Sequence, residues 1–163
     1  MRGRRMIQLM MVAALVVSIA PPAAAGPRAG GRQVTWGEFT TLPGGTELGY
    51  EIEGRAIMVR SPGREGHTRV ALHLGGLDAH ASYPVHVHNQ PCSATPAGGS
   101  HYQHEVGGAA DNVNEIWPVV KTNTTGNGVG RATHGHWARS DAMSIVVHYP
   151  ANTSIRLACA DLN

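Results

Sequence analysis

The chain has 163 residues, of which 42% are hydrophobic, with 13 Lys and Arg against 11 Asp and Glu. This length excludes a multidomain protein, and the hydrophobic fraction is that of a globular protein rather than a disordered one. The cations do not cluster outside the N-terminus, which argues against a nucleic-acid partner, since phosphate binding needs clustered cations. With 21 Gly and 10 Pro, a small, loop-rich β domain is expected.

Residues 1–25 have the layout of a secretory signal peptide. A basic start that includes Arg2, Arg4 and Arg5 precedes an apolar run of 15 residues, and small residues follow up to Ala25. The run is shorter than the roughly 20 residues that span a bilayer, so a cleaved signal is favoured over a stable membrane anchor. Cleavage leaves ten cations against eleven acidic residues. We expect a secreted protein, periplasmic or extracellular, with a charge near −1.

Export bears on the two cysteines, Cys92 and Cys159. An oxidising compartment favours one disulfide between them. The loop that it closes would remove roughly 4 kcal/mol of unfolded-chain entropy. The alternative is that both thiols bind a metal, but they lack the close spacing of such pairs.

Short β-branched runs separated by Gly, Pro, Asn and Ser predict an all-β sandwich or barrel of about eight antiparallel strands. The predicted strands are 34–41, 50–60, 68–74, 84–88, 116–121, 130–138, 142–149 and 155–160. A long functional loop is predicted between the fourth and fifth strands, over 89–115. Residues 26–48 form an N-terminal extension without an assigned role before the main domain, 49–163.

Histidine is the residue type that points to chemistry, because all ten lie between His67 and His148. In Val85-His86-Val87-His88 the strand period of two places both valines on one face and both histidines on the other. His101 follows in the long loop, and His148 ends the strand 142–149. Imidazoles without thiolates suit copper or zinc, and copper if the task is redox. The alternative for the pair is two polar residues facing solvent.

The order of these motifs resembles the copper/zinc superoxide dismutase family. The similar segments are Tyr83-Pro84-Val85-His86-Val87-His88, Cys92, Gly99-Ser100-His101-Tyr102, Ser144-Ile145-Val146-Val147-His148 and Ile155-Arg156-Leu157-Ala158-Cys159. The resemblance runs from about Thr68 to the end of the chain. It implies a Greek-key β-sandwich or barrel, and a secreted superoxide dismutase that converts superoxide to dioxygen and hydrogen peroxide by cycling a histidine-bound copper.

The resemblance also implies a role for each matching residue. The copper ligands are His86, His88, His101 and His148, the disulfide joins Cys92 to Cys159, and Arg156 contacts the anionic substrate. His101 occupies the position that bridges copper and zinc in the family, and it is expected to deliver a proton.

Two departures from the family pattern favour its copper-only branch. After His101, the only residues available for zinc before the next strand are His104, Glu105, Asp111 and Glu115, so an ordinary zinc site is not expected. Only seven residues separate His148 from Arg156, too few for the long charged loop of the usual enzymes. In the copper-only branch an acidic residue replaces zinc as the partner of the bridging histidine. Glu115 is the first candidate for that residue and Asp111 the second.

The sequence leaves two rival functions open, and it predicts roles for three further side chains. The first rival hypothesis is an exported copper-binding or buffering module of the same fold. The second is a secreted sandwich that has lost its metal. The second pair, His134 and His136, is predicted to be polar surface, with an auxiliary metal site or a copper-entry patch as the alternatives. Trp117 is predicted to pack in the sandwich. The oligomeric state, monomer or homodimer, is not predicted.

Overall fold

The computed structural model describes residues 31–163, so the predicted signal peptide lies outside the described part. Within that part the elements are ten strands and one short helix, α1 (Pro43–Glu47). The strands are β1 (Gln33–Glu38), β2 (Thr40–Thr41), β3 (Glu53–Ser61), β4 (His67–Gly75), β5 (Ser82–Tyr83), β6 (Val85–His88), β7 (Val119–Thr122), β8 (Gly128–His134), β9 (Ser144–Tyr149) and β10 (Asn152–Asp161).

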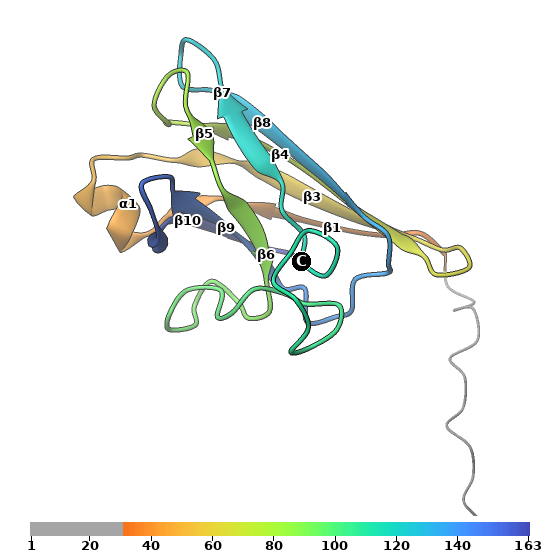
Figure 1. Ribbon diagram of the computed structural model, residues 1–163. Coiled ribbons are helices and arrows are strands. Elements are labelled where there is room, and N and C mark those ends of the chain that lie inside the picture. Colours follow the sequence, from red (N-terminus) through yellow and green to blue (C-terminus); the bar gives the residue numbers. More distant parts are fainter. Residues whose placement is uncertain (1–30) are drawn as a thin grey trace, which may run out of the picture.

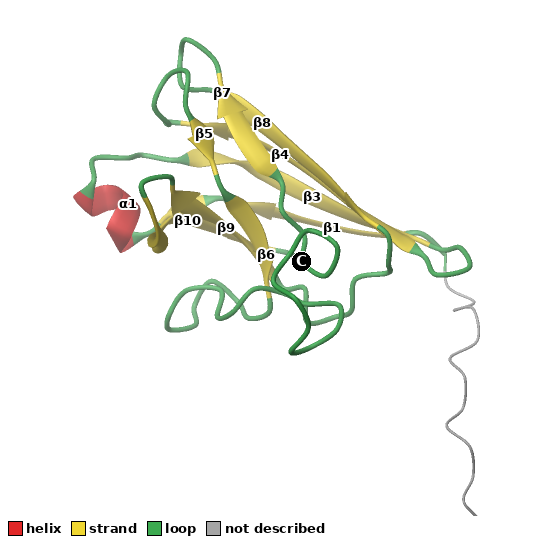
Figure 2. Ribbon diagram, in the orientation of Figure 1, coloured by secondary structure: helices red, strands yellow, loops and turns green. Residues whose placement is uncertain are grey.

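The strands form two antiparallel sheets that face each other as a sandwich (Figures 1 and 2). One sheet has the order β1-β3-β4-β8-β7-β5, and the other has the order β2-β10-β9-β6. The sheets do not close into a barrel. The prediction of an all-β sandwich is therefore confirmed.

Alternating side chains build the core between the sheets. In β4 the inward residues Val70, Leu72 and Leu74 are at most 4% exposed, and in β6 Val85 and Val87 are fully buried. Because a strand turns successive side chains to opposite faces, this burial sends the histidines of β6 to the other side of the four-stranded sheet. The fold thus separates the aliphatic core from the histidine face.

Each of the eight predicted strands overlaps an observed one, with local differences. The predicted strand 130–138 ends early, because residues 135–138 leave β8 in a turn. The N-terminal extension has a structural place: β1 pairs along its length with β3, and β2 pairs with β10. Helix α1 and the two-residue strand β5 are not among the predicted elements.

The segment 89–115 forms a long loop below β6, as predicted (Figure 1). A disulfide joins Cys92 in this loop to Cys159 in β10, which confirms the predicted pairing. The amide of Cys92 also donates to Asp161 Oδ1 at 2.7 Å. The start of the loop is thereby fastened to the four-stranded sheet.

The disulfide is compatible with an extracellular protein, because such bonds persist in oxidising compartments. Among residues 31–163, no helix has the length and apolar character needed to cross a membrane.

Candidate metal centre

Three of the candidate ligands lie on two neighbouring strands. His86 and His88 are on β6 and His148 is on β9, and the register of these strands pairs Val85 with Val147. The rings of His86 and His148 therefore lie side by side, with centroids 4.8 Å apart. His88 is fully buried and His148 is 3% exposed.

The long loop brings the fourth ring, His101, back to β6. His101 forms an isolated antiparallel bridge with His88, and the amide of Tyr102 donates to the carbonyl of Val87 at 2.9 Å. Tyr102 is fully buried and anchors this stretch. The His101 ring consequently lies 4.1 Å from the ring of His86, centroid to centroid.

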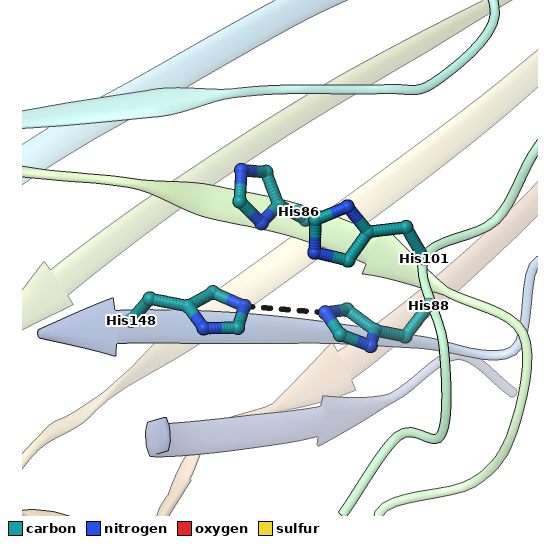
Figure 3. Close-up of side chains that lie close together, drawn as sticks. All are labelled: His86, His88, His101 and His148. Atoms are coloured by element: carbon teal, nitrogen blue, oxygen red, sulfur yellow. Dashed lines mark hydrogen bonds between the residues drawn. The ribbon is translucent and has the colours of Figure 1, made fainter. Parts of the chain in front are cut away.

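The four rings converge on one point (Figure 3). Each offers one nitrogen, and these nitrogens lie within 4.8 Å of one another. A single ion with bonds of about 2 Å allows a separation of about 4 Å across it. The rings need to draw together by only about 1 Å to share an ion, so the group can bind a metal.

The remaining ring nitrogens show which atom each histidine presents. Nδ1 of His88 faces the carbonyl of Gly99 at 3.2 Å, Nδ1 of His148 faces the carbonyl of Thr153 at 2.6 Å, and Nδ1 of His101 faces Glu115. These three rings are left with Nε2 for a metal. His86 differs, because its buried Nδ1 has no hydrogen-bond partner.

His88 and His148 turn Nε2 atoms toward each other at 3.2 Å, the dashed line in Figure 3. Both rings carry the proton on Nδ1, since each Nδ1 faces a carbonyl that can only accept. Burial lowers the pKa of His88 to about 2 and that of His148 to about 4, so both rings are neutral at pH 7. Two lone pairs therefore face each other. A tetrahedral ion holds its nitrogen ligands about 3.3 Å apart, which is the spacing that would relieve this repulsion.

Glu115 is the acidic residue that contacts the centre. Its carboxylate is almost fully buried, and its Oε2 lies 2.6 Å from Nδ1 of His101. Two other side chains donate to it: Trp117 Nε1 to Oε2 at 2.8 Å and Gln103 Nε2 to Oε1 at 3.1 Å. The carboxylate of Asp111 instead accepts from the amides of 113 and 114, so Asp111 shapes the turn before Glu115.

Trp117 thus has a role beyond the packing predicted for it. Its half-buried ring lies 5.6 Å from the ring of His86, and its N–H fixes the carboxylate that faces His101. The sequence signal was the two-residue spacing from Glu115, which turns both side chains to the same side of an extended segment.

Arg156 lies beside His148 of the centre. In the β9–β10 register it is the direct partner of His148, and its charge lowers the pKa of both His88 and His148, after the larger effect of burial. Its guanidinium donates to the carbonyl of Ala97. Gly98 and Gly99, both with positive φ, turn the loop here. A Cβ on Gly98 would lie 2.8 Å from Val146 and 3.1 Å from the Cβ of His88, so the turn needs glycine.

Three histidines gather at a second place, beside the centre. His104 stacks on His136, and His134 lies next to both. His134 is 2% exposed, so the prediction that it is polar surface is wrong. The reason is that the long loop covers this end of β8, which the alternation within one strand does not reveal.

No protein-family model matches the chain, and no curated protein matches it. The candidate centre therefore stands on its own geometry: a metal-binding group of four histidines, a buried carboxylate on one of them and a guanidinium alongside.

Proposed function

We propose that the chain is an exported, copper-dependent superoxide dismutase of the copper-only type. The support comes from the motif resemblance and from the surroundings of the four histidines. Four imidazoles without a thiolate suit copper. The place that zinc would hold beside His101 is taken by Glu115, at 2.6 Å from Nδ1. Secretion follows from the predicted signal peptide and fits the disulfide.

The observation that carries the proposal is the position of Arg156. A site that only stores a cation gains nothing from a guanidinium next to its ligands, because like charges repel. A site that handles a small anion does gain, since a fixed cation attracts and orients it. Within the described residues the Arg156 side chain donates one hydrogen bond, to Ala97, which leaves its other N–H groups for such an anion.

When bound, copper supplies one-electron exchange, in which one superoxide loses an electron and leaves as dioxygen while a second gains it and leaves as hydrogen peroxide with two protons. The protein's own groups supply the rest. Arg156 draws in and orients the anion. Glu115 holds the proton of His101 on Nδ1 and fixes the ring. The His101 side chain is 32% exposed, so solvent protons reach it, and its Nε2, when it does not hold the metal, would deliver one of the two protons that the peroxide takes up.

The strand connection next to the centre is short. β9 ends at Tyr149 and β10 begins at Asn152, so no long loop lies over the centre from this side. With a chain charge near −1, long-range steering of an anion is weak. The local field of Arg156 is the main attraction that remains.

The decisive experiment compares Arg156→Ala with Arg131→Ala, which removes the same charge from an exposed position on β8. A hydrogen bond between a guanidinium and an anion contributes about 1.5–3 kcal/mol, so we expect superoxide decay to slow about 10- to 100-fold in Arg156→Ala. Copper content should stay within about twofold of the unchanged protein, and Arg131→Ala should behave like it. His148→Ala should lose both copper and activity.

The rival function, an exported copper-binding or buffering module, predicts another pattern. Arg156→Ala would then change copper binding and superoxide decay to the same extent, or change neither. Either result contradicts the enzyme proposal.

A further inference from the structure

The rings of the second histidine group lie as close together as those of the first, although among the described residues only the first group already brings its nitrogens together. The ring centroids of His104, His134 and His136 are 3.9, 5.1 and 5.8 Å apart. In the four-histidine centre the corresponding distances run from 4.1 to 6.4 Å. The second group contains none of the four residues of the first, and nothing in the proposed dismutase reaction uses it.

Buried ring nitrogens without partners mark this group as unsatisfied. Neither nitrogen of His134 makes a hydrogen bond, although the residue is 2% exposed, and Nδ1 of His104 is buried and equally unpartnered. A buried polar atom left unsatisfied costs about 1–3 kcal/mol. Such atoms persist in a native structure for a reason, and an unfilled ligand position is one.

The surroundings of His104 and His134 favour the neutral form of their rings. Burial lowers the pKa of His104 and of His134, and the neighbouring rings lower the pKa of His104 further. Nearby backbone groups of the long loop and of His136 act in the opposite direction and raise the pKa of His134 by a smaller amount. Neutral imidazoles are the form that binds metal.

The backbone of each ring is held in place without the help of any ion. His134 is paired in register with Thr68, whose hydroxyl also donates to the carbonyl of His136 at 2.8 Å. The amide of His104 donates to the carbonyl of Asn114 at 2.8 Å, and its carbonyl accepts from Arg139. The three side chains therefore start from a fixed scaffold.

We propose that His104, His134 and His136 form a second metal site, for a divalent ion of borderline softness such as Zn(II). Three imidazoles with water as the fourth ligand are an ordinary donor set for zinc. Because His136 is half-exposed, solvent can supply that water. The site does not share His101 with the first centre, since Nδ1 of His101 is bound to Glu115.

One ring must turn for the ion to bind. His104 and His136 are stacked with an angle of 9° between their planes, so their lone pairs run parallel instead of meeting. His136 is the ring with room to rotate, because it is partly in solvent and His134 is not. An ion bound here would join the long loop, through His104, to the end of β8, and so stabilise the loop that carries His101.

The test is the number of Zn(II) ions that the metal-free, full-length mature protein binds in equilibrium dialysis. Four proteins are compared with the unchanged one: His136→Ala, His104→Ala, His148→Ala for the first centre, and His73→Ala as the control, an exposed histidine on the outer face of β4. The unchanged protein and His73→Ala should bind two equivalents. Each of the other three variants should bind one equivalent. The affinity of the lost site should fall by more than about 10- to 100-fold, the loss that follows removal of a residue that only hydrogen-bonds to a ligand.

The outcomes separate the two centres. If His136→Ala and His104→Ala bind as much Zn(II) as the unchanged protein, the second site does not exist, whatever His148→Ala does. If His148→Ala alone binds as much as the unchanged protein, the first centre fails and the second stands. Near-UV circular dichroism, expected to be unchanged in His136→Ala, shows that its loss of zinc is not loss of the fold.

Discussion

Glu115→Gln tests how far the buried carboxylate controls the metal-binding ring of His101. The carboxylate accepts from three side chains, and the shortest of these contacts, 2.6 Å, is to Nδ1 of His101. Glutamine keeps the size of the side chain and one accepting oxygen but loses the charge. Its amide nitrogen must face either His101 or Gln103, and both of those currently donate.

The hydrogen bonds set the expected magnitude. A bond to a charged acceptor contributes about 1.5–3 kcal/mol and a neutral one about 0.5–1.5 kcal/mol, so each bond to Oε2 loses about 1 kcal/mol. His101 and Trp117 both bond to that atom. If the amide nitrogen faces His101, Nδ1 of the ring must accept a hydrogen bond, so the ring proton moves to Nε2. Nε2 is then no longer free to bind a metal. Together these effects predict copper affinity about 10- to 100-fold weaker.

The assay is competition for copper with a chelator of known affinity, with Glu105→Gln as the control. Glu105 is an exposed carboxylate in the same loop, so the control makes the same chemical change without touching the centre. Trp117→Phe removes one of the three donors and should weaken copper binding less than Glu115→Gln. Equal copper affinity in Glu115→Gln and Glu105→Gln would refute the claim that Glu115 orients the ring.

Two further predictions concern stability. The metal-free protein should lose stability as the pH falls from 7 to 5, because the pKa of His148 is about 4 in the folded protein and near 6.5 in the unfolded chain, which therefore takes up the proton first. This ring alone lowers the free energy of unfolding by about 2 kcal/mol over that pH range. A urea-unfolding midpoint, measured with a chelator present, that is unchanged or higher at pH 5 would contradict the prediction. Replacing both Cys92 and Cys159 by Ser should lower the free energy of unfolding by about 4 kcal/mol and Tm by about 15 °C, because the disulfide closes a loop with a sequence separation of 67 residues. A shift of only a few degrees in scanning calorimetry would show that the disulfide does not stabilise the protein by restraining the unfolded chain.

Local patterns made much of the fold predictable. The alternation in 85–88 predicts which side chains enter the core, and Val85 and Val87 are indeed fully buried. Alternation within one strand does not predict which distant segment that strand pairs with. The pairing of β1 with β3 shows this, since nothing within 26–48 says that it completes the six-stranded sheet.

The surroundings of the centre were predictable only where a motif carried them. The neighbouring strands of His86 and His148 follow from the resemblance, whereas the second group depends on how the long loop folds. His104 is 30 residues from His134 along the chain, and Arg139 and Thr68 bring them together through contacts with the backbone. Packing between a loop and a strand end leaves no period in the sequence, so the sequence alone predicts a solvent-facing His134.

The tight connection between β9 and β10 bears on how a small anion could reach the centre. Only two residues, 150 and 151, lie between these strands, and they end beside the histidine and guanidinium pair. If the centre handles a small anion as proposed, no long loop has to open on this side, so arrival is expected to be limited by encounter and not by a gating step.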